Sequence, residues 1–141
     1  MTHLDAPALA QKAIEARAAA YAPYSRFAVG AALLAEDGTV YTGCNVENAS
    51  YGVSCCAERN ALFHAVSSGA RRFAGIAVAG APAQEGFDTP QQKCPPCGVC
   101  RQALFEFCGP QLPVVLALGA GDWETHTLGE LLPHGFGPGN L

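Results

Sequence analysis

The chain is poor in charge and poorest in lysine. Only 14% of its 141 residues are charged, and only two residues are lysine. Eight basic against twelve acidic residues give a net charge of −4 at pH 7. A chain with so few cations offers no footprint for the phosphates of nucleic acid or for an anionic membrane surface. We therefore expect neither nucleic acid nor a membrane among its partners.

Long apolar runs are also missing. Every apolar stretch is broken by Glu, Asp, Gly or Pro well before the ~18 residues that a membrane-spanning helix needs. The first five residues have neither the basic start nor the apolar segment of a secretory signal. Half of the residues are hydrophobic, which excludes a disordered chain. We expect a soluble cytoplasmic protein that folds as a single domain over residues 1–141.

Cysteine, by contrast, is abundant. Seven cysteines occur, at positions 44, 55, 56, 94, 97, 100 and 108. An odd number excludes complete disulfide pairing within the chain. In a reducing cytosol, clustered cysteines are more often metal ligands or catalytic thiols than disulfides. The composition thus indicates that the chemistry of this protein depends on sulfur.

The order of the predicted elements favours a sheet covered by helices. Helices are expected over 5–20, 56–68 and 97–107, strands over 27–34, 39–45, 73–80 and 112–118, and a loop over 81–95. Glu36-Asp37-Gly38 predicts a hairpin turn between the first two strands. A possible strand near 124–127, a short helix over 128–132 and an irregular tail over 134–141 complete the chain. This alternation predicts an α/β fold, a three-layer α-β-α sandwich with a mixed, about five-stranded sheet.

Two segments at predicted helix starts carry residues suited to metal chemistry. They are Cys56-Ala57-Glu58-Arg59 and Pro96-Cys97-Gly98-Val99-Cys100-Arg101. Cys97 and Cys100 lie three residues apart, so their thiols face the same side of a first helical turn. A helix N-terminus also lowers the pKa of a thiol. Cys56 and Glu58 are only two residues apart, so they can share a site only if Cys56 lies at or next to the first residue of its helix.

Three thiolates and an open fourth position form a catalytic zinc site, in which a nearby carboxylate such as Glu58 moves protons. Zinc with three thiolates carries a formal charge of −1, which a neighbouring cation relieves. Arg59 and Arg101 are both candidates, and we favour Arg59. The alternative is a closed structural site with four cysteines, whose fourth ligand could be Cys44, Cys55, Cys94 or Cys108.

The motifs of this chain resemble those of the zinc-dependent nucleobase deaminases, which combine a ligand-x-Glu element with Pro-Cys-x-x-Cys. The similarity is greatest to the small, homotetrameric cytidine deaminases with three cysteine ligands. It extends over nearly the whole chain, through residues 21–25, 24–33, 43–51, 56–59, 96–102 and 131–136. The resemblance implies zinc-dependent hydrolytic deamination of cytidine and 2′-deoxycytidine to the uridines with release of ammonia, a step of pyrimidine salvage.

The resemblance also implies a role for each residue of the two helix starts. Cys56, Cys97 and Cys100 would bind one zinc ion per chain. Glu58 would act as the proton shuttle while zinc-bound hydroxide attacks C4 of the cytosine ring. Arg59 would offset the negative charge of the thiolates.

Further residues would bind the nucleoside. By the same resemblance, Phe27 would pack against the pyrimidine, Asn45 and Glu47 would bind the ribose hydroxyls, and the backbone N–H of Ala57 would meet the base carbonyl. Judged without the family, Phe27 is a core residue of a strand. Asn45 and Glu47, two apart, face the same side of a strand end.

Two aromatic residues suggest shared sites. The resemblance implies that Tyr51 and Phe136 each reach the site of a neighbouring subunit in the tetramer. An aromatic side chain in a short, glycine-rich tail finds no core of its own, which agrees with this role for Phe136.

The chain departs from its relatives at Pro95, where many of them carry Ser. Cys55 and Cys94 are additional thiols without an assigned role. Cys44 and Cys108 are expected to be small buried residues. Three other functions remain as alternatives: a blasticidin-type antibiotic deaminase, a deaminase of RNA or DNA, and a zinc-stapled binding module without enzymatic activity.

Overall fold

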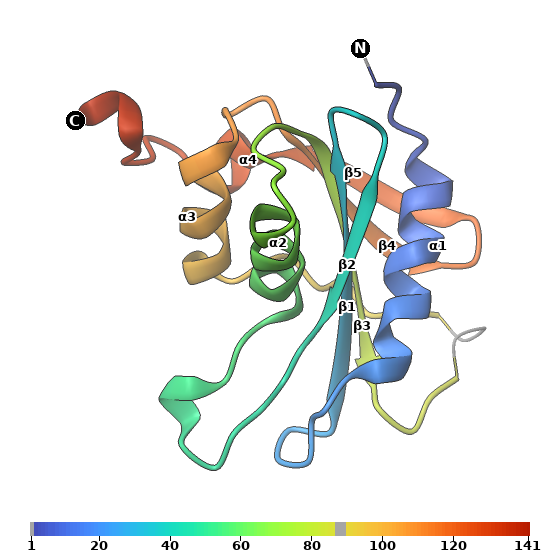
Figure 1. The fold of residues 1–141 in the computed structure, drawn as a ribbon. Coiled ribbons are helices and arrows are strands. Elements are labelled where there is room, and N and C mark those ends of the chain that lie inside the picture. The colour runs from blue at the N-terminus through green and yellow to red at the C-terminus, as the bar shows by residue number, and fades with distance from the viewer. Residues whose placement is uncertain (1, 87–89) are drawn as a thin grey trace.

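The structure is a computed structural model that describes residues 2–86 and 90–141. Its centre is a mixed five-stranded sheet in the order β2-β1-β3-β4-β5 (Figure 1). The strands are β1 (Phe27–Ala35), β2 (Val40–Cys44), β3 (Phe73–Pro82), β4 (Pro113–Gly119) and β5 (Asp122–Thr127). β3 and β4 are parallel, and the other neighbours are antiparallel. The predicted mixed sheet is confirmed.

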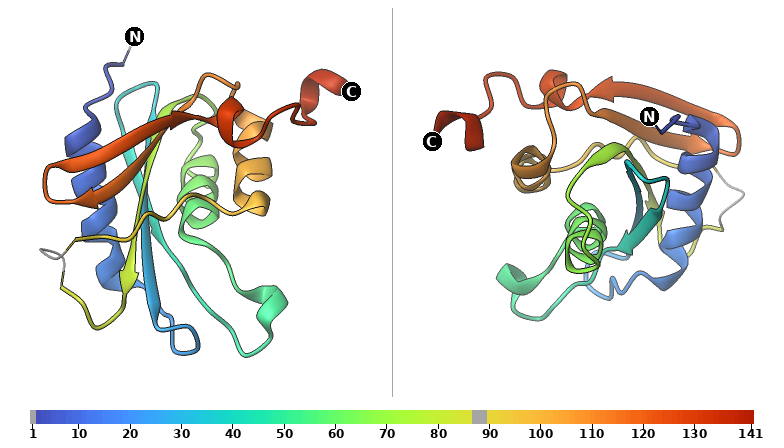
Figure 2. Two further views of the ribbon diagram at one scale, coloured as in Figure 1. Left: turned by 180° about the vertical axis from the view of Figure 1, so that it is seen from behind. Right: turned by 45° about the horizontal axis from the view of Figure 1, so that its top comes forward.

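Helices cover both faces of this sheet, as the three-layer prediction requires. α1 (Ala6–Ala16) lies on one face, and α2 (Ala57–Ser67) and α3 (Gly98–Phe107) lie on the other (Figures 1 and 2). The short α4 (Leu128–Leu131) follows β5. No helix in the described part of the chain has the length and hydropathy needed to cross a bilayer.

Each face has its own apolar core. The core under α1 contains Leu9 and Ile14 of that helix against small residues of β1, β3 and β4. The core under α2 and α3 contains Leu62 and Leu104, packed on Ile76 and other larger side chains. The interior thus holds the two helices of the second face in fixed positions relative to the sheet.

Two glycines allow the helices to approach the sheet closely. A Cβ on Gly30 of β1 would lie 2.1 Å from the carbonyl oxygen of Ala13 in α1. A Cβ on Gly43 of β2 would lie 2.4 Å from the backbone nitrogen of Ala61 in α2. Backbone atoms of a packed helix cannot move aside cheaply, so both positions require glycine.

Several predicted boundaries change. The first helix is α-helical only to Ala16 and continues as a 3₁₀ turn over Arg17–Ala19. β3 extends to Pro82, two residues into the predicted loop, because it stays paired with β1 to that point. The rest of that loop lies partly outside the described residues. The tail also contains a 3₁₀ turn, Pro138–Asn140, where no regular structure was expected.

Candidate active site

The start of α2 places Cys56 and Glu58 as the sequence requires. Cys56 is the N-cap residue, with extended backbone angles of φ −72° and ψ 156°, and its side chain makes no capping hydrogen bond. Ala57 is the first helical residue and is completely buried. In a regular helix the side chains of residues i and i+2 point in different directions. Because the backbone of Cys56 is extended, its side chain can face the same site as Glu58, as their spacing in the sequence requires.

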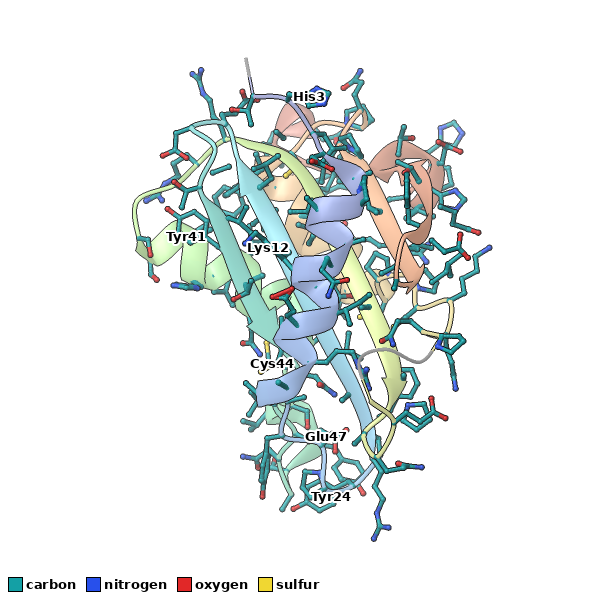
Figure 3. All side chains as sticks on the ribbon, turned by 90° about the vertical axis from the view of Figure 1, so that its right-hand side faces the viewer. His3, Lys12, Tyr24, Tyr41, Cys44 and Glu47 are labelled. Atoms are coloured by element: carbon teal, nitrogen blue, oxygen red, sulfur yellow. The ribbon has the colours of Figure 1, made fainter. Side chains whose placement is uncertain are left out.

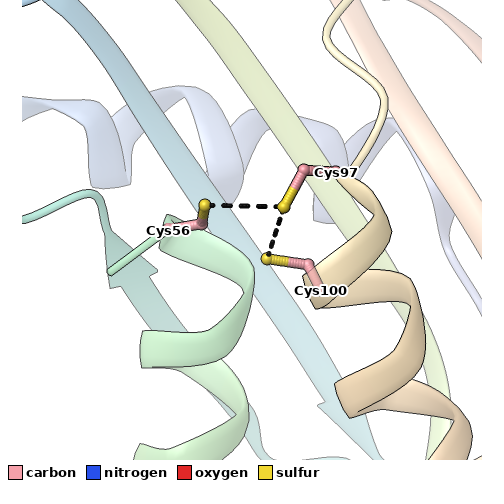
Figure 4. A group of neighbouring side chains, drawn as sticks. All are labelled: Cys56, Cys97 and Cys100. Atoms are coloured by element: carbon pink, nitrogen blue, oxygen red, sulfur yellow. Dashed lines mark hydrogen bonds between the residues drawn. The ribbon is translucent and has the colours of Figure 1, made fainter. Parts of the chain in front are cut away.

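The start of α3 brings two more thiols to the same place. Cys97 is the N-cap of α3, and Cys100 lies in its first turn. The sulfur of Cys97 lies 3.8 Å from that of Cys56 and 3.6 Å from that of Cys100 (Figure 4). The three sulfur atoms all lie within 4.8 Å of one another. Two helix N-termini, 41 residues apart at their caps, therefore present one triangle of thiols.

This donor set fits a zinc ion. Three sulfur ligands suit zinc, and among residues 2–86 and 90–141 no fourth His, Cys, Asp or Glu atom joins the group. The Cys100 thiol and the Arg59 guanidinium donate to Cys56, which lowers the pKa of Cys56 to about 5. A thiolate, the form that binds metal, is thus already favoured at Cys56.

Arg59 is the cation beside the sulfurs. Its Nη2 lies 3.6 Å from the sulfur of Cys56. Arg101, the other candidate, is used elsewhere: its guanidinium donates to the carbonyl oxygens of Pro96 and Leu131, each at 2.6 Å. Of the two arginines, Arg59 is therefore the one whose guanidinium contacts a thiol of this group.

Glu58 is a buried carboxyl group next to the thiols. Only 4% of its surface is exposed. Burial raises the pKa of Glu58 to about 7, and the negative charge of Cys56 acts in the same direction. A carboxyl group with such a pKa can both accept and release a proton near neutral pH.

The residues expected to bind ribose make contacts within the chain. Oε1 of Glu47 accepts hydrogen bonds from the backbone N–H groups of Tyr24 and Ser25, at 3.0 and 3.1 Å. Figure 3 shows Glu47 and Tyr24 close together at one end of the sheet. Tyr51 completes the wall of the hollow that Glu47 and Tyr24 line. Glu47 therefore lies on the wall of a concave surface.

Asn45 is held firmly between two strands. Its Nδ2 donates to the carbonyl oxygen of Phe27 at 2.8 Å, and its Oδ1 accepts from the backbone N–H of Val29 at 2.9 Å. This amide links the end of β2 to the start of β1. The same bond fixes the backbone of Phe27, whose side chain is half-buried.

Phe27 lies close to Cys94, a contact that the sequence did not indicate. A Cβ on Gly80 would lie 2.8 Å from the Phe27 ring and 2.9 Å from the sulfur of Cys94, so the ring and this thiol converge over Gly80. Burial raises the pKa of Cys94 to about 12. Cys94 is not one of the three cysteines whose sulfur atoms lie within 4.8 Å of one another, which disfavours it as a fourth ligand.

The two aromatic residues expected to reach other subunits are exposed at separate places. Tyr51 is 75% exposed and stacks edge-on against Tyr24, with ring centroids 5.9 Å apart. Phe136 is 59% exposed and lies in the segment that extends beyond α3 (Figures 1 and 2).

Sequence reasoning erred or was silent at a few residues. Cys108 is buried as expected, but Cys44 is only half-buried, because it ends an outer strand. Arg17 was not singled out, yet it is 3% exposed and donates to the carbonyl oxygens of Ala28, Ala81 and Pro82. A single arginine within the alanine-rich run 16–20 was the one available signal.

Comparison with known proteins agrees with this geometry. Residues 5–116 match the family described as the cytidine and deoxycytidylate deaminase zinc-binding region. Cytidine deaminase of Sporosarcina psychrophila is 47% identical over 138 residues, which is 98% of this chain and 96% of that protein. The crystal structure of cytidine deaminase from Burkholderia pseudomallei has 49% identity and a TM-score of 0.81, covering 96% of this chain and all of that one. The corresponding structure from Mycobacterium tuberculosis has 41% identity and a TM-score of 0.75, covering 96% and 99% of the two chains.

Proposed function

The chain belongs to the cytidine and deoxycytidylate deaminase family, and from this we propose that it is a zinc-dependent hydrolase that converts cytidine and 2′-deoxycytidine to the corresponding uridines. The reaction consumes one water and releases one ammonia. The observation that carries the proposal is the buried carboxyl group of Glu58 beside three converging thiols. A closed structural site needs a fourth ligand and has no use for that carboxyl group.

Cys56, Cys97 and Cys100 would hold the zinc ion. When bound, zinc lowers the pKa of a coordinated water and so supplies a nucleophile near neutral pH. Arg59, 3.6 Å from the Cys56 sulfur, offsets the charge of the three thiolates. The thiols of two helix N-termini also gain from the partial positive charge at those ends.

Glu58 moves the protons of the reaction. It would accept a proton as water attacks C4 and deliver that proton to N3 of the ring. It would then accept the proton of the new C4 hydroxyl and deliver it to the departing amine, so that the uridine carbonyl forms as ammonia leaves. A single group can serve these steps because its pKa of about 7 lies near the working pH. Its burial also keeps bulk water from competing for the proton.

Four residues position the nucleoside in this proposal. Phe27 packs against the pyrimidine, and the Ala57 backbone N–H donates to the base carbonyl. Asn45 and Glu47 bind the ribose hydroxyls. The second oxygen of Glu47 and the second N–H of Asn45 suit a sugar diol, because the other atoms of both side chains already hold the β1 end of the sheet.

We further propose that the single domain assembles as a homotetramer in the cytoplasm, where it serves pyrimidine salvage. Tyr51 and Phe136 are large, exposed aromatic side chains, and each would reach the site of a neighbouring subunit. The net charge of −4 disfavours a nucleic acid substrate.

One assay tests this function against its alternatives. The fall in absorbance on deamination is followed with cytidine, 2′-deoxycytidine, cytosine, blasticidin S and a cytidine-containing oligonucleotide. We expect turnover of the first two only. Glu58→Gln should keep its zinc and fold but lose at least about 10²–10⁴-fold in rate, the contribution of general acid–base catalysis. Turnover of blasticidin S or the oligonucleotide alone, or an active Glu58→Gln variant, would refute the proposal.

A further inference from the structure

The segment after α4 is folded into a defined shape although it has little regular structure. We call residues 133–141 the arm. His134 adopts a left-handed backbone conformation, φ 55°, which turns the chain. Gly137 and Asn140 then close a turn: the Gly137 N–H donates to Asn140 Oδ1 at 2.8 Å, and the Asn140 N–H donates to the Gly137 carbonyl at 2.9 Å. The arm is therefore a preformed structure and not a loose end.

Side chains of α3 fasten the arm. Gln102 Nε2 donates to the carbonyl oxygen of Phe136 at 2.8 Å. The neighbouring Arg101 binds the chain two residues before the arm begins, by donating to the Leu131 carbonyl oxygen at 2.6 Å. Gly137 is buried, and a Cβ there would lie 2.7 Å from two carbons of the Phe105 ring. The backbone at Phe136 and Gly137 is thus held on α3.

The consequence is that the Phe136 side chain projects outward. Its carbonyl is bound and the next residue is buried, yet 59% of Phe136 itself is exposed. Because the backbone is held at residues 136 and 137, the direction of the Phe136 Cα–Cβ bond is fixed relative to α3. An exposed aromatic held rigidly loses little entropy when a partner covers it.

We infer that Gln102 and Gly137 are positioning residues, which fix the direction in which Phe136 reaches the active site of a neighbouring subunit. This inference rests on the proposed function, in which Phe136 contributes to that site. Cys97 and Cys100 lie at the start of α3. The same helix would therefore supply two zinc ligands to the site of its own subunit and hold the arm that completes the site of a neighbouring subunit.

Matched glycine variants test the inference. Gly137→Ala places a methyl group against the Phe105 ring, whereas Gly139→Ala meets nothing within 4 Å. For Gly137→Ala we expect the KM for cytidine to rise about fivefold or more, as overpacking displaces the arm. Zinc content and kcat should stay near wild type. Gly139→Ala should leave all of these values unchanged.

Removal of the amide gives an independent variant. Gln102→Ala loses one hydrogen bond, so we expect the KM to rise about two- to tenfold. The exposed Gln11 of α1 provides the control Gln11→Ala, which should behave as wild type. Amide hydrogen exchange should become faster over residues 133–141 in Gly137→Ala and Gln102→Ala, and in neither control.

The double variants separate positioning from a general structural role. If Gly137 and Gln102 act through Phe136, then adding either substitution to Phe136→Ala raises the KM no further. Two results would overturn this inference and leave the shared site standing. One is that the KM increases of the single variants multiply in the double variants; the other is an unchanged KM in Gly137→Ala together with a raised KM in Phe136→Ala. An unchanged KM in Phe136→Ala would refute the shared site itself, and the inference with it.

Discussion

The two faces of the sheet use the same packing device for different purposes. Gly30 and Gly43 lie on adjacent paired strands, and each lets a helix backbone rest on the sheet, α1 on one face and α2 on the other. The helices differ at their N-termini. α1 is capped by Asp5, whose side chain accepts from the Ala8 N–H at 3.1 Å. α2 and α3 begin with cysteines that make no capping hydrogen bond.

The different N-termini fit different roles: α1 stabilises the fold, whereas α2 and α3 supply the groups of the site. The Asp5 cap satisfies one of the free N–H groups at the start of α1, and the buried residues of this helix are all apolar. Uncapped helices leave these donors and their positive end directed at the site, where thiolates benefit from them. Changes on the α1 face should therefore alter folding, and changes at the starts of α2 and α3 should alter function. The following predictions test this division.

The largest effect is expected from a thiol of the triangle. Cys97→Ala leaves two sulfur ligands, so we expect zinc content to fall from about one per chain to near zero and activity to reach background. Cys94→Ala is the matched control three residues earlier, and it should keep its zinc. Metal analysis after gel filtration gives the answer. Loss of zinc from both variants would show that the ligand set has been assigned wrongly.

A smaller effect is expected at the cation beside the sulfurs. Arg59→Gln removes the donor to Cys56, and changes next to a metal ligand typically cost 10–100-fold in metal affinity or activity. We expect a loss in that range, measured by competition with a zinc chelator and by kcat. Arg72→Gln, an exposed arginine on the chain between α2 and β3, should have no effect. Equal zinc retention in both variants would contradict the role of Arg59.

The site was predictable where the chain determines geometry locally. The spacing of Cys97 and Cys100 within one helical turn and the need for Cys56 to start its helix both follow from helix geometry. The hairpin at Gly38 follows from the conformational freedom of glycine, which has φ 92° there. In such cases the residues that interact are close neighbours in sequence.

Contacts between distant segments were not predictable in the same way. Nothing in the sequence indicates that Cys94 and Phe27 meet over Gly80. The burial of Arg17 was equally hidden, because its three acceptors are backbone carbonyls up to 65 residues away. Such contacts depend on how the elements pack, and backbone groups carry no signal in the sequence.

Substitution of Gly30 and of Gly43 should show that the two faces of the sheet affect stability and activity differently. Gly30→Ala and Gly43→Ala both force a methyl group into a helix backbone, so each should lower the free energy of unfolding by about 1–3 kcal/mol or more. Only Gly43→Ala should also lower the kcat of the folded fraction, because it displaces the helix that carries Glu58. Denaturant unfolding and titration of active sites separate the two quantities. A normal kcat in folded Gly43→Ala would contradict the division.

The smallest effect is expected at the capped end of α1. Asp5→Ala removes the side chain that accepts from Ala8, and loss of such a cap typically costs about 1 kcal/mol. We expect a lower denaturant midpoint with unchanged zinc content and kcat, since α1 lies across the sheet from the thiols. Asp5→Asn, which keeps a capping oxygen, should recover most of the stability. If Asp5→Ala instead lowered kcat in the folded protein, the two faces would be coupled, because a helix that contributes no group to the site would then control its geometry.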